Sequence, residues 1–276
     1  INTVEDLAVL KQVVVQNVAP DGVAVLNACD PRTAEMAIHC PGSVTFFASE
    51  PHHPIVAAHR AQGHRVVYLD GDRIVAARGD AEQRLPLAEI PLTRGGILRF
   101  QVENAMAAVA AAWALELGWD VIRRGLHSFD SNADTVPGRF NLFDYRGATL
   151  IADYGHNPDA ISALVKAVEA LPAQRRIVVI SGAGDRRDDD IREQTRILGA
   201  AFDAAVLYQD QCQRGRAEGE VLALLREGLH NAARTRDIEA VTGEFLAIDT
   251  ALSRLNPGDL CLILVDQVEE ALAHIS

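Results

Sequence analysis

An aspartate and a histidine lie close together in the segment 152–158, Ala-Asp-Tyr-Gly-His-Asn-Pro. An apolar run that is typical of a buried strand precedes this segment, and Pro158 suits the first turn of a helix capped by Asn157. Asp153 and His156 would then lie between a strand end and a helix N-terminus. There they could contact a ribose, a phosphate or a metal-bound oxyanion. A capped turn with a solvated histidine fits the same residues.

Two further segments contain groups that could contact a phosphate. Arg139 follows Pro-Gly at a predicted domain junction, and its planar guanidinium suits bidentate contact with a phosphate. The alternative is a surface arginine after a turn. The segment 181–190, SGAGDRRDDD, has small residues that allow a ligand to approach the backbone. However, G-x-G alone is a weak motif, and the acids could simply form the first turn of a helix.

Charged residues of both signs fill the segment 208–220, which follows another apolar run. With Arg214 and Arg216 beside several acids, this segment could select a substrate that carries both charges. A solvated loop is the alternative. Asn104 lies near the start of an Ala-rich helix, where an asparagine can read adenine through two hydrogen bonds but more often caps the helix.

An alternation of strands and helices from residue 140 onward must position most of these groups. Such alternation predicts parallel pairing in a three-layer α/β sandwich, in which a ligand lies at the carboxyl ends of the strands. The predicted strands are 140–145, 148–153, 175–181, 203–207, 237–241 and 259–264, and the predicted helices are 158–170, 188–200, 217–233, 244–254 and 266–275.

The first half of the chain also reads as α/β. Two apolar runs around Asp70-Gly71-Asp72 predict a β-hairpin. The polar stretch 130–139 contains Pro-Gly and predicts a domain boundary, which we place between residues 136 and 137. The other predicted elements are helices at 4–18, near Pro31, at 101–117 and at 120–129 with Asp120 as a possible cap, and strands at 23–27 and 43–48.

Composition narrows the class of protein. The chain has 276 residues, of which 49% are hydrophobic, so it can bury a sizeable core. A net charge of −12 argues against nucleic acid or an anionic membrane as the main partner. No apolar run approaches the ~20 residues of a membrane span. The four cysteines form no metal-ligand spacing, which favours a reduced, cytoplasmic protein.

Missing motifs exclude several chemistries. The sequence contains no GxxxxGK[ST] loop to cradle the β- and γ-phosphates of a nucleotide, and it contains neither HExxH nor GxSxG. Only two of the 26 basic residues are lysines, Lys11 and Lys166, which hints that amine chemistry matters where a lysine is kept. The chain opens on Ile1 in what reads as mid-domain sequence, so we expect its N-terminus to be missing.

The segments in this order resemble the Mur ligase family. Four carry the resemblance: VLNACDP (25–31), QVENAMAAVAAAWA (101–114), VPGRFN (136–141) and IADYGHNPDA (151–160). Within the family, further segments resemble the C-terminal half of cyanophycin synthetases: IPLTRGG (90–96), FDSN (129–132), GAGDRRDDDI (182–191), RGRAEGE (214–220), NPGDL (256–260) and DQVEEAL (266–272).

This resemblance implies a fold and a reaction. Residues 1–136 would be the distal part of the central ATPase domain, with a β-hairpin insertion near 62–90, and residues 137–276 the Rossmann-like C-terminal domain. ATP would phosphorylate a carboxylate, and an amine would attack the acyl phosphate to form an amide, with Mg²⁺ stabilising the developing charge. In cyanophycin synthetases the Mur-like half adds arginine to the side-chain carboxylates of poly-aspartate.

The resemblance also implies roles for single residues. Lys11 would bind Mg²⁺ as a carbamate, which an arginine could not form. Asn104 would contact adenine, Arg139 the ATP phosphates and Asp153 the ribose, with His156 and Asn157 completing that loop. Lys11 and His156 are thus the predicted catalytic residues. The predicted substrate contacts are Arg214, Arg216 and, for a guanidinium, Asp210, Glu218 and Glu220.

Two departures from the family pattern limit these roles. Cys29 stands where the family usually has an aspartate. The P-loop and further Mg²⁺ ligands would precede Ile1, so we expect this chain to be inactive without a missing N-terminal part. A folylpolyglutamate or UDP-MurNAc-peptide ligase of the same family, or a non-catalytic binding module, remains an alternative. A homo-oligomer is also compatible with the sequence.

Overall fold

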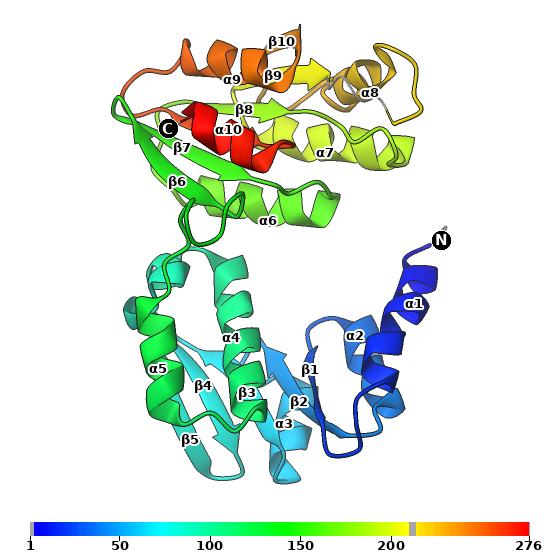
Figure 1. Cartoon of the computed structure of the whole chain (residues 1–276), viewed down its shortest axis with the longest axis vertical. Helices are drawn as coiled ribbons and strands as arrows, with labels where there is room; N and C mark the ends of the chain where they lie inside the picture. The colour runs from blue at the N-terminus through cyan, green and yellow to red at the C-terminus, as the bar shows by residue number, and fades with distance from the viewer. Residues whose placement is uncertain (1–2, 210–213, 276) are drawn as a thin grey trace. The chain divides into compact units, whose positions relative to one another are not determined.

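The chain forms two compact units, unit 1 (residues 1–130) and unit 2 (residues 131–276), in a computed structural model that describes residues 3–209 and 214–275 (Figure 1). The division falls inside the polar stretch 130–139 that predicted a boundary. No helix among the described residues has the length and apolar character needed to cross a membrane.

Unit 1 contains a five-stranded sheet of order β1-β2-β3-β4-β5. Strands β1 (Val23–Asn27), β2 (Ser43–Ala48) and β3 (Arg65–Asp70) are parallel, and β4 (Arg73–Arg78) and β5 (Ala81–Pro86) continue antiparallel. The predicted hairpin is confirmed as β3–β4, with Gly71 of its two-residue loop at φ +59°. The strand β5 and the helix α3 were not predicted.

The helices of unit 1 pack on this sheet through small and β-branched residues. Helix α4 buries Ala105, Met106 and Val109 against β3 and β4. Helix α5 begins at Trp119 with Gly118 as its N-cap, so the prediction of Asp120 as cap is wrong: Asp120 lies in the first turn. The helices are α1 (Val4–Gln16), α2 (Pro31–Glu35), α3 (Pro54–Ala61), α4 (Arg99–Ala114) and α5 (Trp119–Ser128), with 3₁₀ segments η1 (Met36–His39), η2 (Leu87–Glu89) and η3 (Pro91–Gly96).

Unit 2 contains a six-stranded sheet of order β10-β9-β8-β11-β7-β6. Its strands are β6 (Asn141–Tyr145), β7 (Ala148–Asp153), β8 (Arg176–Ile180), β9 (Ala204–Gln209), β10 (Asp237–Thr242) and β11 (Leu260–Leu264). All are parallel except the edge strand β6. The six predicted strands are therefore confirmed, each within two residues at either end.

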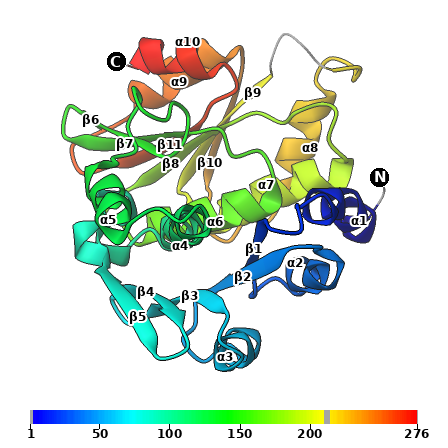
Figure 2. The ribbon, with the colours of Figure 1, turned by 60° about the horizontal axis from the view of Figure 1, so that its bottom comes forward.

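Helices cover both faces of this sheet, as the strand–helix alternation predicted. Figure 2 shows α9 (Glu244–Leu252) and α10 (Val268–Ile275) on one side and α6 (Pro158–Glu169) and α7 (Asp188–Ala201) on the other. The inner strands β9 and β11 are buried along their whole length, because each lies between two helical layers. The predicted helix 217–233 is shorter, α8 (Glu220–Gly228), because Gly219 at φ +79° precedes it and Asn231 at φ +59° follows it.

The strand order creates a crevice beside β11. The chain leaves β7 and β8 toward α6 and α7 on one face of the sheet, whereas it leaves β11 toward α10 on the opposite face. Adjacent strands whose following segments diverge in this way open a crevice at their carboxyl ends, where α/β sheets bind ligands. A ligand of unit 2 is therefore expected beside the loops after β7, β8 and β11.

Candidate functional site

Asp153 is the last residue of β7, and its carboxylate is buried at 7% exposure. One oxygen accepts the N–H of Phe140 (2.9 Å) and the other accepts the N–H of Gly155 (2.6 Å). Burial raises the pKa of Asp153, although the two N–H donors and the nearby charges of Arg139 and His156 act in the opposite direction. The carboxylate thus ties the segment before β6 to the loop after β7, and each oxygen still has a lone pair for a ligand.

The loop 154–157 holds His156 in place from both sides. Its Nδ1 lies 2.6 Å from the carbonyl of Tyr154, and its own carbonyl accepts the amide of Gln194 on α7 at 2.8 Å. The prediction that Asn157 caps the following helix is confirmed, since its side chain accepts the N–H of Ala160. His156 is therefore a fixed group at the carboxyl edge of the sheet.

Charged side chains from four loops meet at this edge, in a group we call the edge cluster: His156, Asp185, Arg214 and Asp266. Asp266, after β11, lies 3.9 Å from His156 Nε2 and 3.6 Å from Arg214 Nη2. The other terminal nitrogen of Arg214 lies 3.3 Å from Asp185, in the loop after β8. Asp266 thus brings the predicted residues His156 and Arg214 together, and Asp185 pairs with Arg214; neither acid was a predicted site residue.

Glu244 is a buried carboxylate that sequence reasoning missed. It is the first residue of α9, is 3% exposed, and accepts the backbone N–H groups of Asp266 (2.8 Å) and Gln267 (3.1 Å). These contacts fix the start of the segment that carries Asp266 into the edge cluster. Acidic residues are common at helix starts because they interact favourably with the helix dipole. The position of Glu244 in the sequence therefore gave no reason to select it as a site residue.

Ser181, immediately after β8, has a buried hydroxyl without a hydrogen-bond partner in the part of the chain that the structure describes. The next residue, Gly182, has no room for a side chain, because a Cβ there would lie 2.8 Å from Val221 Cγ1. The prediction that small residues let a ligand approach this backbone remains a prediction. An unpaired hydroxyl at the crevice is compatible with it, since buried polar groups normally find partners.

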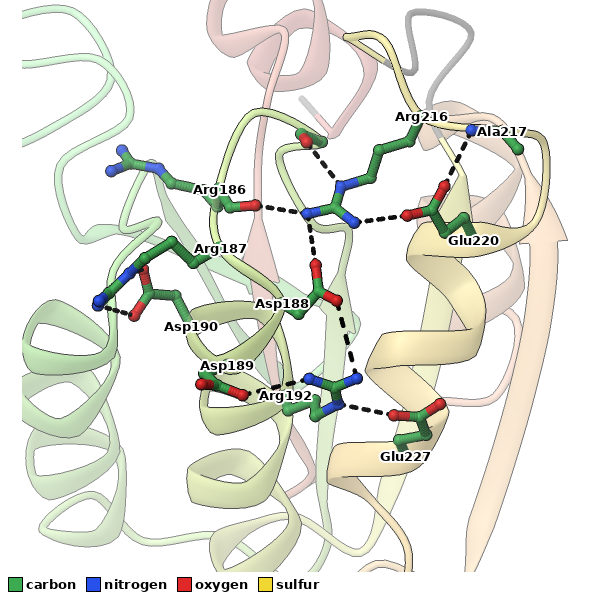
Figure 3. A network of polar contacts seen from close by, with 11 residues as sticks. Arg186, Arg187, Asp188, Asp189, Asp190, Arg192, Arg216, Ala217, Glu220 and Glu227 are labelled. Atoms are coloured by element: carbon green, nitrogen blue, oxygen red, sulfur yellow. Dashed lines mark hydrogen bonds and ion pairs between the residues drawn. The ribbon is translucent and has the colours of Figure 1, made fainter. Parts of the chain in front are cut away.

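Arg216 and Glu220 form an ion pair, in which Arg216 is largely buried and Glu220 is exposed (Figure 3). Arg216 Nη1 lies 2.6 Å from Glu220 Oε1, and hydrogen bonds from Arg216 and the Ala217 N–H lower the pKa of Glu220. Glu218 is exposed. The predicted contact Asp210 lies outside the described residues. Of the five predicted substrate residues, two are therefore already bound to each other.

Lys11 and Asn104 belong to unit 1, whereas the other described candidates belong to unit 2. Lys11 is exposed on α1. Asn104 lies in the second turn of α4, which begins at Arg99, so it is not a cap; its amide donates to Gln101 Oε1 at 3.0 Å. Arg139 is exposed in unit 2, with its guanidinium carbon 5.7 Å from the Tyr154 ring centre. The convergence of Asn104, Arg139 and Asp153 on one ligand stays a prediction.

Comparisons with known proteins agree with this architecture. Residues 138–264 match the family described as Mur ligase, glutamate ligase domain. A cyanophycin synthetase of Crocosphaera subtropica is 36% identical over an alignment that covers all of this chain and 32% of that protein. Residues 138–264 belong to this Mur ligase domain family. The resemblance that the motifs indicated, including that to cyanophycin synthetases, is thereby confirmed along the whole chain.

More distant relatives extend the same picture. A UDP-N-acetylmuramyl-tripeptide synthetase of Deinococcus radiodurans is 30% identical over 90% of this chain and 48% of that protein. A Mycobacterium tuberculosis folylpolyglutamate synthase complexed with ADP shares the fold, with a TM-score of 0.65 and 19% identity over 94% of this chain and 56% of that chain. The chain spans about a third of the cyanophycin synthetase that it matches.

Proposed function

We propose that this chain is the C-terminal part of an ATP-dependent ligase that forms amide bonds through an acyl phosphate. The support is the identity to cyanophycin synthetases along the whole chain, together with a Mur-type unit 2 whose charged groups gather at the carboxyl edge of its sheet. In this reaction ATP activates a carboxylate, and the incoming amine displaces phosphate from the acyl phosphate. The need for ATP also favours the cytoplasmic location that the cysteines predict.

The proposed role of unit 2 is to hold the incoming amino acid. The edge cluster offers a cation, two acids and an imidazole within one group of loops, which suits a substrate that carries both charges. Asp185 and Asp266 give it acidic character, which favours a cationic side chain such as that of arginine. We therefore propose arginine as the amino acid and the side-chain carboxylates of poly-aspartate as its acceptor.

The nucleotide contacts follow from the family resemblance. We propose that Asp153 holds the ribose, Asn157 completes that loop, Arg139 contacts the phosphates and Asn104 contacts adenine. His156 would orient the reacting groups from its fixed position at the crevice. The described residues contain no group of three His, Cys, Asp or Glu side chains placed to hold a metal ion. Lys11, as a carbamate, would be a ligand of Mg²⁺, which would stabilise the negative charge that develops on the phosphoryl oxygens.

Titration of the isolated chain with ATP tests its dependence on other residues. Without a GxxxxGK[ST] loop in the sequence, we expect weak or no ATP binding and no ATP hydrolysis. Hydrolysis at a rate typical of ligases would contradict this part of the proposal.

A substrate assay on the full-length polypeptide encoded by the gene tests the substrate. Phosphate release should require ATP, a poly-aspartate acceptor and arginine. Charge reversal of Glu218 should selectively weaken arginine use, whereas reversal of the distant, exposed Glu239 should not. Equal activity with glutamate or diaminopimelate in place of arginine would favour another branch of the family. The absence of any ATP-dependent ligation would favour a binding module.

A further inference from the structure

Arg216 has more side-chain hydrogen bonds and ion pairs than Arg214, Glu218 and Glu220, the other predicted substrate residues that the structure describes. Its Nε donates to the carbonyl of Gly184 at 2.7 Å, and its Nη2 donates to the carbonyl of Arg186 at 2.6 Å. The guanidinium also pairs with Asp188 at 2.8 Å and with Glu220 at 2.6 Å. Its side chain is only 15% exposed, although most arginines of this loop region reach solvent.

These four contacts connect three separate parts of the chain. The two carbonyls belong to the glycine-containing loop after β8, Asp188 is the first residue of α7, and Glu220 is the first residue of α8. Figure 3 shows Arg216 reaching across from the loop after β9 to all three. Glu220 in turn accepts the backbone N–H of Ala217 at 3.1 Å, so it also holds the residue that follows Arg216 in its loop.

The arrangement uses nearly all the hydrogen-bonding capacity of the guanidinium. Arginine has five N–H donors in a planar fork, and here all three nitrogens are engaged. A substrate carboxylate or phosphate could reach Arg216 only by displacing these contacts. A lysine at this position would have a single nitrogen to serve contacts that the guanidinium spreads over three.

We propose that Arg216 is a positioning residue: it holds the loop 182–187 in one conformation at the carboxyl edge of the unit 2 sheet, instead of binding the substrate itself. This loop begins with Gly182, directly after Ser181, and carries Asp185 of the edge cluster. Its first three residues, Gly182–Gly184, are small and Asp185–Arg187 are exposed, so a side chain that bonds two of its carbonyls and bridges them to two helices can decide its conformation. The effect on catalysis rests on the proposed ligase function, whereas the effect on the loop does not.

Hydrogen–deuterium exchange on the chain tests the loop directly. In Arg216→Ala, amide exchange in residues 182–187 should rise at least tenfold. Arg216→Lys should behave in the same way, because one ammonium group cannot reach both carbonyls and both acids. Glu220→Gln should give an intermediate rise. The matched control is Arg187→Ala, which removes a neighbouring exposed arginine that pairs with Asp190 on α7; its exchange should stay within twofold of wild type.

Peptides from β8 and β9 report whether each variant is folded, and their exchange should not change. If Arg216→Ala did not fold, Arg216→Lys and Glu220→Gln would still decide the question. Unchanged loop exchange in these variants, with the strands protected, would overturn the proposal. So would full protection of the loop by Arg216→Lys, since charge alone would then suffice.

Kinetics of the full-length polypeptide test the consequence for the site. Arg216→Ala and Arg216→Lys should lower kcat/KM for the amino acid at least tenfold, and Arg187→Ala should not. A looser loop with unchanged kcat/KM would overturn the positioning role. If wild type showed no ligation at all, the proposed function would fail, while the exchange experiment would still decide whether Arg216 orders the loop.

Discussion

Replacing Asp153 by asparagine should destabilise unit 2, because two backbone N–H groups depend on its two oxygens. The carboxylate accepts from Phe140 at 2.9 Å and from Gly155 at 2.6 Å. Asparagine offers one oxygen and one NH₂ group, so in either orientation the NH₂ faces one of these donors. Phe140 is itself held at φ +52°, a conformation that favours glycine, which makes the contact harder to replace.

The magnitude follows from one lost contact and one buried N–H without a partner. Such a group costs about 1–3 kcal/mol. Relief from burying a charge offsets part of this loss, so we expect a net loss of about 2 kcal/mol. For a unit of this size the urea dependence is about 2 kcal/mol per molar, which predicts a midpoint lower by about 1 M.

The assay must report on unit 2 alone, because the two units need not unfold together. Hydrogen exchange of β7 and β11 peptides at increasing urea meets this need. Asp144→Asn is the matched control: Asp144 lies exposed on the neighbouring strand and accepts only the Gly147 N–H, at 3.4 Å. An Asp153→Asn urea midpoint equal to that of Asp144→Asn would show that the two N–H contacts of Asp153 do not stabilise unit 2.

The pH dependence of the same pair separates the two effects on Asp153. Burial raises its pKa in the folded state, in spite of the N–H donors. A raised folded pKa means that the wild-type contribution is complete below the unfolded pKa, about 4, and decreases as the pH rises through the folded pKa. The stability gap between wild type and Asp153→Asn should therefore narrow as the pH rises. A gap that widens would show that the N–H donors outweigh burial.

Three further perturbations have definite outcomes. Gly228→Ala should lower the unfolding free energy of unit 2 by about 3 kcal/mol in urea, because the new Cβ would lie 2.1 Å from a backbone oxygen of α7. Gly125→Ala should be neutral or slightly stabilising, because a Cβ there would have no atom within 4 Å. Equal effects of the two substitutions would contradict this expectation. Burial alone would raise the pKa of Asp203, but its hydrogen bonds to Arg234 lower that pKa, so the stabilisation from Asp203 is present above about pH 4 and lost as the pH falls further. Asp203→Asn should therefore make the unfolding free energy depend less on pH in acid. An unchanged dependence would contradict the stabilising role of the Asp203–Arg234 pair. Complete burial raises the pKa of Cys261 to about 12, so iodoacetamide should leave it unmodified in the native state by mass spectrometry; rapid labelling would contradict its burial.

The sequence predicted the elements that carry strong apolar runs. The strands of unit 2 are buried on both faces, and runs such as Arg-Ile-Val-Val-Ile in β8 leave little ambiguity. The strand β5, Ala-Glu-Gln-Arg-Leu-Pro, was not predicted because only one of its residues is buried, so it has no apolar pattern. It forms through its antiparallel pairing with β4. The helix α3 escaped because it is short and buries a single valine.

The local structural positions of the candidate residues were predictable, but their pairings were not. A strand end followed by a capped helix located Asp153 and Asn157 correctly, because local rules decide both. The partners of Arg216 could not be read from sequence. Many acids lie within thirty residues of it, and only the tertiary positions of the loops select Asp188 and Glu220. Glu244 was overlooked for the same reason, since its role depends on where the segment after β11 lies.

Identification of the ligation product is the most direct test of the proposed ATP-dependent addition of arginine to poly-aspartate. The full-length polypeptide is incubated with ATP, a short poly-aspartate peptide and ¹⁵N-labelled arginine, and the peptide is then analysed by tandem mass spectrometry. The account predicts labelled arginine in amide linkage to aspartate side-chain carboxylates, formed only when ATP is present. An acceptor peptide that stays unmodified with arginine but gains a different amino acid, or gains none, would contradict it.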